Sequence, residues 1–333
     1  MHFNYNLSNK ILGWYDNNKR NLPWRVSKKS KKKLYYRLLS EFMLQQTQVK
    51  TVIPYFDRFT KKYKTLKDLS KSSEKEILKL WEGLGYYRRA RNLLKCSKLL
   101  VKNYNFKLPK TINEIKQLPG IGEYTGNALL GLVHDQPTIA IDGNVKRIFS
   151  RLLNKEVKKV NLEKIILLNK SKLFKTNRNS DFVEGIMEFG ALVCKPKNPN
   201  CVSCCLKKTC KYFKSSNKIK ASKKKMVKKK DYNIFCYINK SKQIALTKKN
   251  QLGFLKNFNL PRIEETNCFV DTKNWKFLKK YKNSISNLEL NINLYYKFSD
   301  KIPSSYNWYS LENNKEFVPS FTKKVFRQVS TLF

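Results

Sequence analysis

Apolar residues recur at helical spacing through most of the first 200 residues of the chain. In the segment 7–20, for example, Leu7, Ile11 and Trp14 would share one face of a helix. The same periodicity predicts further helices at 34–44, 49–62, 69–80, 93–101, 125–133, 145–153, 161–175 and 181–193. We therefore expect a mainly α domain over residues 1–213.

The pattern changes after the segment 214–230, whose basic, low-complexity composition is typical of a linker. Beyond it, the segments 231–238, 243–247 and 288–296 alternate between apolar and polar residues, as strands do. Residues 231–333 are therefore expected to form a second, smaller α+β domain.

Two glycines interrupt the helical pattern within the stretch 118–124. A capping-box pattern that begins at Thr111 predicts a short helix just before them. Pro119 cannot continue that helix, and Gly120 and Gly122 permit a tight turn with positive φ. The prediction is a helix-hairpin-helix, whose second helix begins with free N–H groups that can hold a phosphate. A plain helical hairpin with a glycine turn would give the same pattern.

The chain is strongly basic, with 70 Lys and Arg against 24 Asp and Glu and a formal net charge of +46. Such an excess attracts polyanions, most often nucleic acid. A composition rich in Lys throughout would give the same total without forming a binding face. The sequence shows no long apolar run and no signal-peptide pattern, so we expect no membrane association and a cytoplasmic, nucleoid-associated location.

Two carboxylates stand where they could perform acid–base chemistry. Glu41 lies among apolar residues of its predicted helix, and a carboxyl group in such surroundings has a raised pKa and can donate a proton near neutral pH. Asp142 follows a short extended run, 137–141, and precedes the helix 145–153. Both residues could have an ordinary structural role instead. Glu41 could be an exposed residue on the surface of its helix, and Asp142 or Asn144 could be the N-cap of the next helix.

Two short segments carry side chains suited to DNA. The segment 45–48 is a cluster of amides that can bond base edges, or a simple polar turn. The segment 81–91 contains two glycines, two tyrosines and three arginines. Aromatic side chains can wedge into a base stack and arginines can hold phosphates, although a glycine-broken helix junction with core tyrosines is the alternative.

Five of the eight cysteines fall within the segment 194–210. Such clustering in a large chain without a secretory pattern favours metal ligation over disulfides. Cys194, Cys201, Cys204 and Cys210 would supply four thiolates to a zinc ion or an iron–sulphur cluster. Only one Cys-x2-Cys pair is present where a zinc ribbon usually has two, so the spacing favours a [4Fe–4S] cluster. With only two histidines, His-based metal sites and Ser-His-Asp catalysis are nearly excluded.

Together these motifs resemble the adenine DNA glycosylases of the MutY family, which belong to a helix-hairpin-helix superfamily with the endonuclease III-like enzymes. The resemblance covers residues 7–213 strongly and 231–333 weakly. It is carried by the cysteine spacing and by Leu22-Pro-Trp-Arg25, Ser40–Val49, Gly83-Leu-Gly-Tyr-Tyr87, Leu118-Pro-Gly-Ile-Gly122 and Ile141–Arg147. This chain departs from the family in a longer loop between Trp24 and Glu41, and in Cys205, which stands where proline is common.

The resemblance implies hydrolysis of the N-glycosidic bond of adenine mispaired with 8-oxoguanine or guanine in double-stranded DNA, by a monomeric enzyme. Glu41 would be the general acid, and Asp142 would stabilise the cationic sugar. Tyr124 stands where lyase-type relatives carry a lysine, which implies a monofunctional enzyme. The other implied site residues are Trp24, Arg25 and Glu184 around the pocket, Gln46 and Tyr86 in the base stack, and Gly120 and Gly122 at a backbone phosphate.

For residues 231–333 the resemblance implies a Nudix-like domain that inspects the lesion. Ser286 would contact the oxidised guanine, unless its loop is an ordinary polar turn. Two other functions of the whole chain would fit the same motifs. One is an endonuclease III-like glycosylase/lyase acting on oxidised pyrimidines. The other is a DNA-binding iron–sulphur protein without catalysis, which the presence of Glu41 and Asp142 disfavours.

Overall fold

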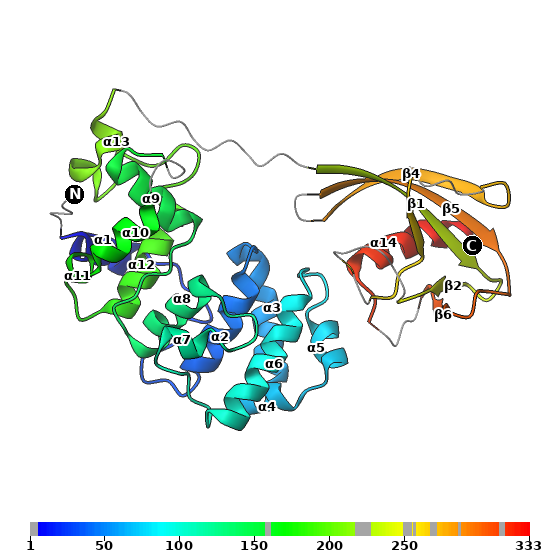
Figure 1. Ribbon diagram of the computed structural model, residues 1–333, viewed down its shortest axis with the longest axis horizontal. Coiled ribbons are helices and arrows are strands. Elements are labelled where there is room, and N and C mark those ends of the chain that lie inside the picture. The colour runs from blue at the N-terminus through cyan, green and yellow to red at the C-terminus, as the bar shows by residue number, and fades with distance from the viewer. Residues whose placement is uncertain are drawn as a thin grey trace. The chain divides into compact units, whose positions relative to one another are not determined.

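The computed structural model describes residues 6–156, 161–216, 228–248, 255, 258–266, 272–285, 288–312 and 317–333 of the chain. The chain divides into two compact units, Met1–Ser222 and Lys223–Phe333. The first is built of helices and the second around a sheet (Figure 1). Ser286, expected to contact the lesion, lies outside the described residues. No helix in the described parts of the chain is long and apolar enough to span a bilayer.

The helices of the first unit follow the predicted periodicity, with bounds that differ by several residues and with two predicted helices divided. The helical class of this unit is confirmed. Its elements are, in chain order, α1 (Leu7–Asn18), α2 (Lys33–Leu44), α3 (Val49–Lys62), α4 (Leu66–Lys71), α5 (Glu74–Leu80), α6 (Arg88–Asn103), α7 (Ile112–Ile115), α8 (Glu123–His134), α9 (Gly143–Leu153), α10 (Leu162–Leu168), α11 (Lys170–Leu173), α12 (Asn179–Leu192), the 3₁₀ turn η1 (Lys207–Thr209) and α13 (Lys211–Lys214).

The single helix predicted over 69–80 is wrong, because this segment belongs to two helices, α4 and α5. Thr65 and Ser73 each begin a helix with a capping box, in which the cap side chain and the acidic residue three positions on bond each other's backbone N–H. The apolar spacing continues across the break, so periodicity could not reveal it. The predicted helix 161–175 is also divided, into α10 and α11, but Asn169, the N-cap of α11, makes no side-chain capping bond.

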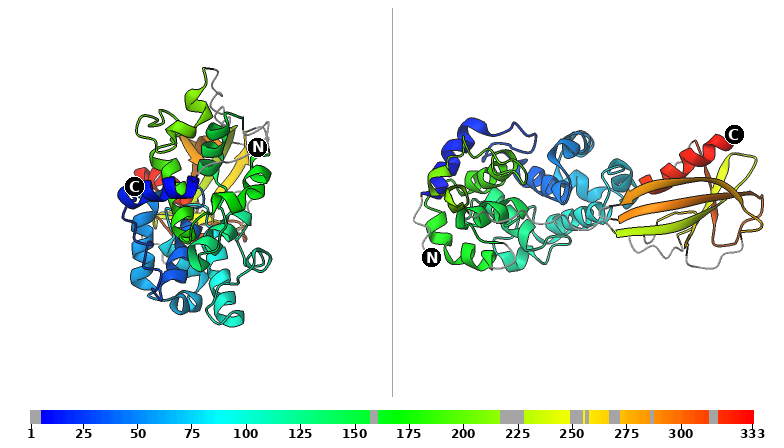
Figure 2. Two further views of the ribbon diagram at one scale, coloured as in Figure 1. Left: turned by 90° about the vertical axis from the view of Figure 1, so that its left-hand side faces the viewer. Right: turned by 90° about the horizontal axis from the view of Figure 1, so that it is seen from above.

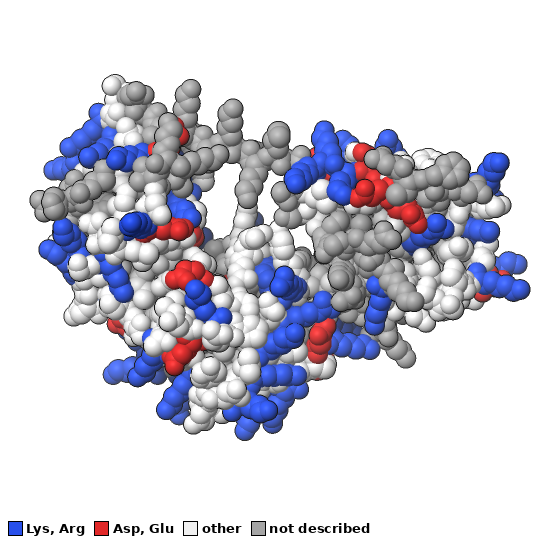
Figure 3. Space-filling view, in the orientation of Figure 1, with Lys and Arg blue, Asp and Glu red and all other residues white. Residues whose placement is uncertain are grey.

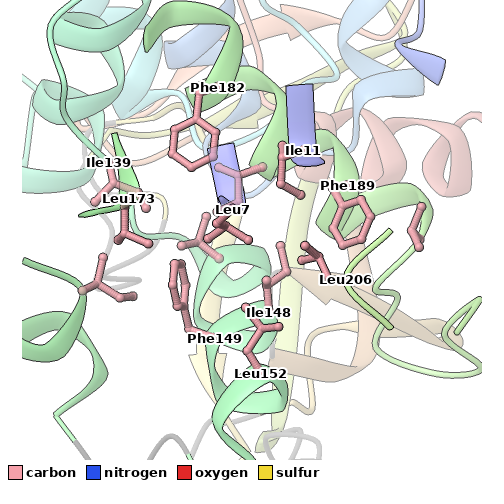
Figure 4. Packing of buried hydrophobic residues seen from close by; sticks show 14 of the residues in the cluster. Leu7, Ile11, Ile139, Ile148, Phe149, Leu152, Leu173, Phe182, Phe189 and Leu206 are labelled. Carbon is pink, nitrogen blue, oxygen red and sulfur yellow. The ribbon is translucent and has the colours of Figure 1, made fainter. Parts of the chain in front are cut away.

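One hydrophobic core brings together helices that are far apart in the sequence (Figure 4). Leu7 and Ile11 of α1 pack in the same cluster as Phe149 of α9 and Phe189 of α12. Trp14, predicted on the same helix face, is half-buried and meets the Phe189 ring edge-on, with 5.1 Å between centroids. This packing fixes α9, which Asp142 precedes, against α12, which carries Glu184.

The second unit contains a six-stranded sheet with the order β4-β5-β1-β2-β6, in which β3 also pairs with β1. β1 and β5 run parallel, and the other paired strands run antiparallel. The strands are β1 (Lys228–Ile238), β2 (Gln243–Leu246), β3 (Arg262–Glu265), β4 (Lys276–Ile285), β5 (Leu288–Phe298) and β6 (Asn307–Ser310). Helix α14 (Ser320–Val329), followed by the 3₁₀ turn η3 (Ser330–Leu332), lies against the sheet (Figure 2). A sheet domain that follows a helical one is therefore confirmed.

The three predicted strands correspond to β1, β2 and β5, whereas β3, β4, β6 and α14 were not predicted. β4 is an edge strand that leaves most of its residues exposed, so it lacks the alternation of a half-buried strand. Helix α14 did carry a signal, since it buries Phe321, Val325 and Val329 at helical spacing.

The helix-hairpin-helix consists of α7, a glycine turn and α8. Thr111 caps α7 by accepting a hydrogen bond from the N–H of Glu114 at 3.3 Å. Gly120 has a φ of 81°, as expected for a residue that allows the left-handed conformation. The expectation of positive φ at Gly122 is wrong, because its φ is −98° and it serves as the N-cap of α8. Only the first glycine of the pair is therefore needed for its backbone conformation.

Replacing each glycine by alanine should show that the turn requires glycine at position 120 and not at position 122. A Cβ at position 120 would lie 2.7 Å from the Cβ of Asn92 and 2.8 Å from Cε1 of Phe42, in a conformation unfavourable for alanine. Gly120→Ala should therefore lower the free energy of unfolding by about 1–3 kcal/mol. At Gly122 a Cβ would meet nothing within 4 Å, so Gly122→Ala should cost less than about 1 kcal/mol. Equal losses in urea denaturation would contradict this.

Candidate functional site

Glu41 lies on the buried face of α2, only 5% exposed, so the alternative of an exposed surface residue is wrong. The apolar neighbours that surround it in the sequence place it in the core because they share its helical turn. Burial raises the pKa of Glu41 to about 7. This value of the pKa includes the charge of Arg37, which lowers it, and the charges of Glu184 and Asp142, which raise it. This carboxyl group can therefore hold a proton near neutral pH.

Asp142 is the N-cap of α9. The structural role that the sequence allowed for this residue, capping a helix, is therefore confirmed. One carboxylate oxygen accepts a hydrogen bond from the N–H of Val145 at 2.7 Å, and the other accepts from Nδ2 of Asn144 at 2.7 Å. Arg147 donates in turn to the side-chain oxygen of Asn144 at 2.7 Å. The carboxylate is thus held in one orientation at the positive end of a helix dipole, and its charge reaches Glu41.

Tyr124 comes from the first turn of α8 and lies close to both carboxyl groups. Partial burial raises the pKa of its phenol, and the charges of Glu41 and Asp142 raise it further. Its hydroxyl lies 3.4 Å from the sulphur of Met187. The helix-hairpin-helix and α9 therefore bring a neutral phenol next to the two carboxyl groups predicted to be catalytic.

Glu184, expected near the pocket, is buried on α12 among polar partners. The hydroxyl of Tyr15 donates to it, and the guanidinium groups of Arg25 and Arg37 form ion pairs with it, the first at 3.0 Å. Arg37 lies one helical turn before Glu41 on α2 and acts on both carboxyl groups. The arginines compensate the Glu184 charge, which would otherwise raise the pKa of Glu41 more strongly.

Arg25 also joins Glu184 to Glu188, with an ion pair of 3.1 Å to Glu188. Arg20 donates to both oxygens of Glu188 at 2.7 Å. Burial raises the pKa of Glu188, but the hydrogen bonds and charges of Arg20 and Arg25 outweigh that effect and lower it to about 2. Trp24, expected at the pocket, is buried, and its ring meets that of Phe56 edge-on.

Gln46 and Tyr86, expected in the base stack, both lie exposed in tight turns. Their φ angles are 58° and 48°, in the left-handed region that residues other than glycine rarely adopt. Tyr86 is 43% exposed although it is a large aromatic residue. From the same turn as Gln46, the Nε2 of Gln45 donates to the carbonyl of Gly120 at 3.4 Å, which ties the end of α2 to the hairpin.

The cysteine loop is held against α9. Arg151 donates to the carbonyl of Lys195 at 2.7 Å and to the sulphur of Cys194 at 3.3 Å. Burial raises the pKa of Cys204, and the neighbouring thiols of Cys194, Cys210 and Cys201 raise it further. In the described residues, no group of three or more His, Cys, Asp or Glu side chains is arranged to hold a metal ion.

The fifth cysteine of the loop has different neighbours. Burial raises the pKa of Cys205 to about 12, and its thiol also responds to the charges of Cys204 and Lys10. The thiols that act on Cys204 are those of Cys194, Cys201 and Cys210, and Cys204 in turn acts on Cys205, so the choice of Cys204 as the third ligand stays a prediction.

Lys and Arg side chains are spread over the face of the molecule that Figure 3 shows, rather than gathered in one patch. This distribution matches a composition rich in Lys throughout. The net charge therefore says less about the site than the geometry of its carboxyl groups does.

Five polar residues of this site were not predicted from the sequence. They are Tyr15, Arg20, Arg37, Arg89 and Glu188. A buried charge looks like any surface charge in a sequence, and only the apolar residues on either side of Arg37 and Glu188 could have signalled burial.

Comparisons with known proteins relate this chain to base excision repair enzymes. A model of the HhH-GPD superfamily of base excision DNA repair proteins matches residues 39–170. An adenine DNA glycosylase of Buchnera aphidicola subsp. Baizongia pistaciae is 35% identical over 323 residues, which cover 91% of this chain and 90% of the relative. The mouse adenine DNA glycosylase is 37% identical over 210 residues, covering 61% of this chain and 41% of the relative.

Solved structures resemble the helical part. A thermostable thymine-DNA glycosylase superposes with a TM-score of 0.56 and 28% identity, covering 62% of this chain and 94% of that one. A trapped endonuclease III–DNA covalent intermediate gives a TM-score of 0.51 and 25% identity over the same shares. The fold and the site thus define a helix-hairpin-helix DNA N-glycosylase of base excision repair. Within that class, the chain belongs to the adenine DNA glycosylase family.

The raised pKa of Glu41 can be tested without measuring catalysis. Because the folded state holds this proton more tightly than the unfolded chain, stability should be lost as pH rises from the ordinary value of 4.5 through about 7. Glutamine does not ionise, so the stability of Glu41→Gln relative to the unsubstituted protein should rise between about pH 5 and about pH 8. Urea denaturation at the two pH values measures this. If the difference in stability between the two proteins were the same at about pH 5 and at about pH 8, the pKa of Glu41 would not be raised.

Proposed function

We propose that this DNA N-glycosylase releases adenine mispaired with 8-oxoguanine or guanine in duplex DNA. The observation that carries the proposal is Glu41, a buried carboxyl group that holds a proton near neutral pH and lies within the electrostatic reach of Asp142. Such a pair, one group protonated and one at a helix N-terminus, suits a reaction that needs an acid and a counter-charge. The names of the relatives support adenine as the base.

The first chemical step is protonation of the leaving base. Adenine leaves poorly as an anion, so its departure requires a proton on a ring nitrogen. Glu41 donates that proton, the bond between the base nitrogen and C1′ breaks, and both bonding electrons stay with the base. Arg37 and Arg25 hold the neighbouring Glu184 carboxylate, so the acid keeps its proton without losing the ability to donate it.

The second step stabilises the sugar cation and adds water. The carboxylate of Asp142 compensates the positive charge that develops at C1′. Its bonds to Val145 and Asn144 fix its position before the charge develops, so little reorganisation is required. Water then attacks C1′ and gives its proton to the Glu41 carboxylate, which restores the acid.

The enzyme is proposed to be monofunctional. A lyase of this superfamily attacks C1′ with a lysine amine at the position of Tyr124. The Tyr124 phenol cannot form an imine. Its pKa is also raised by burial and by the two carboxyl charges, so it is not a nucleophile at neutral pH.

The adenine must leave the base stack before Glu41 can reach it. Gln46 and Tyr86 are proposed to fill the space that it vacates, since both project from exposed turns. The start of α8 is proposed to hold a backbone phosphate, because its first N–H groups have no partner within the helix. The second unit is proposed to be a Nudix-like domain in which Ser286 contacts 8-oxoguanine.

Cys194, Cys201, Cys204 and Cys210 are proposed to hold a [4Fe–4S] cluster. The four thiols fit this group because they act on one another and lie on one loop. The cluster would serve to order the basic loop 195–211, and it takes part in no step of the reaction.

Single-turnover release of adenine from an A·8-oxoguanine duplex tests the two carboxyl groups. Glu41→Gln should slow release by at least about a hundredfold, because an amide cannot protonate the base. Asp142→Asn should slow it by about a hundred- to a thousandfold, because the cation loses its counter-charge. In the unsubstituted enzyme the rate should fall about tenfold per pH unit above about 7, where Glu41 loses its proton.

The controls for this assay use the same duplex with and without alkali, and an oxidised-pyrimidine duplex. Strand cleavage without alkali, or activity on oxidised pyrimidine, would favour an endonuclease III-like lyase instead. Turnover by Asp142→Asn equal to that of the unsubstituted enzyme would remove this residue from the mechanism.

Metal analysis of the purified protein tests the cysteine site. The expected result is about four iron atoms per chain and a broad visible absorbance. Cys201→Ser should lower iron content, solubility and DNA affinity more than it alters the rate of base release. Cys205→Ser is the matched control and should keep the iron. Zinc in place of iron would refute the cluster.

A further inference from the structure

We infer that Arg89 is a positioning residue that locks two DNA-facing turns and the end of the Glu41 helix into one arrangement. The inference rests on the proposed function, because it concerns how the base is extruded. Arg89 lies in the first turn of α6 and is only 7% exposed. Such burial is rare for arginine and requires that its N–H groups find acceptors.

One side of the guanidinium caps the C-terminal end of α2. Its Nη1 lies 3.2 Å from the carbonyl oxygen of Phe42, 2.7 Å from that of Met43 and 2.6 Å from that of Gln45. It also lies 3.1 Å from the hydroxyl of Thr47. The last carbonyls of a helix have no partner within it, and a cation there is favourable. Arg89 therefore fixes both the end of the helix that carries the acid and the turn that follows.

The other side of the guanidinium holds the turn 83–86. Its Nη2 lies 3.2 Å from the carbonyl oxygens of Leu84 and Gly85. The indole of Trp81 also donates to the carbonyl of Gly85 at 3.0 Å, and the cation lies 5.3 Å from the centre of the Tyr86 ring. One side chain thus sets the spacing between two turns that are forty residues apart in the sequence.

These two turns contain the strained residues of the region. Gln46 and Tyr86 both have positive φ, which costs roughly 1–3 kcal/mol at such residues and persists only where the surroundings impose it. Arg89 bonds the carbonyl that directly precedes each of these residues, that of Gln45 and that of Gly85. The guanidinium therefore stabilises the conformation in which both side chains project together. Because it is buried, it is not a phosphate contact.

The test compares single-turnover adenine release from two duplexes. In one, adenine is paired with 8-oxoguanine. In the other it lies opposite an abasic site, where no base pair must be broken. Arg89→Lys keeps the charge but cannot span both turns, so it should lose ten- to a hundredfold on the paired substrate and much less on the unpaired one. Arg91→Lys makes the same change on the same helix, where Arg91 pairs with Glu74 at 2.7 Å, and should show no such selectivity.

A double-mutant cycle identifies the route of the effect. If Arg89 acts through Tyr86, then Arg89→Lys should cost little further activity in a Tyr86→Ala background. The salt dependence of DNA binding should match that of the unsubstituted enzyme, because no phosphate contact is removed. Thermal unfolding of each variant shows whether it is folded at the assay temperature.

Equal losses on the two substrates, additive effects in the cycle or full activity of Arg89→Lys would each overturn the inference. They would leave the proposed function intact. Failure of the unsubstituted enzyme to release adenine from either duplex would instead overturn the proposed function. The two ideas therefore fail on different measurements.

Discussion

The arrangement of the helical unit depends on keeping one carboxyl group protonated beside two others. Glu41 is buried and feels the charges of both Asp142 and Glu184. If neither charge were compensated, the acid would hold its proton too tightly to donate it. The fold provides two solutions, a pair of arginines for Glu184 and a helix N-terminus for Asp142. The arginines and the helix N-terminus compensate the charges of Glu184 and Asp142, and Glu41 itself stays among apolar residues.

Helix ends provide most of the chemistry of this site. Asp142 precedes α9, Tyr124 comes from the first turn of α8, and Arg89 caps the end of α2. Hydrophobic cores pack α9 and α8 against α12, and Gln45 at the end of α2 bonds the carbonyl of Gly120 before α8, so these ends lie together. The capping and the proposed catalytic roles of Asp142 are compatible, because the bonds that cap the helix also orient the carboxylate. An N-cap assignment therefore does not argue against a function for this residue.

Much of the helical unit could be predicted from the sequence, because helical periodicity survives wherever one face is buried. Periodicity could not show the break between α4 and α5, which depends on the cap at Ser73 rather than on the apolar pattern. It also could not show the lysine-rich edge strand β4, whose residues are mostly exposed. The tight turn at Gly120 was predictable from residue type, but the φ of Gly122 was not, since glycine permits more conformations than it adopts.

The candidate site was predictable to the extent that motifs specify it. Glu41, Asp142 and Tyr124 were named from the sequence, and the structure brings them together. Most of the arginines around them were not predicted, because these arginines differ from the others in the chain only in being buried. A sequence does not show which of many positive charges are buried, and in so basic a chain the number of candidates is large.

Arg37 and Arg89 are both buried, but they contribute in different ways, and only the contribution of Arg89 requires arginine rather than lysine. Arg37 meets a carboxylate and compensates its charge, so its contribution is electrostatic. Arg89 meets backbone carbonyls from two separate turns, so its contribution is geometric. A lysine could supply the charge in either place, but its single ammonium nitrogen cannot bond the acceptors of both turns, which lie at the two Nη ends of the guanidinium. The guanidinium of Arg89 bonds acceptors in both turns. One side chain therefore joins the helix that carries Glu41 to the turn that carries Tyr86.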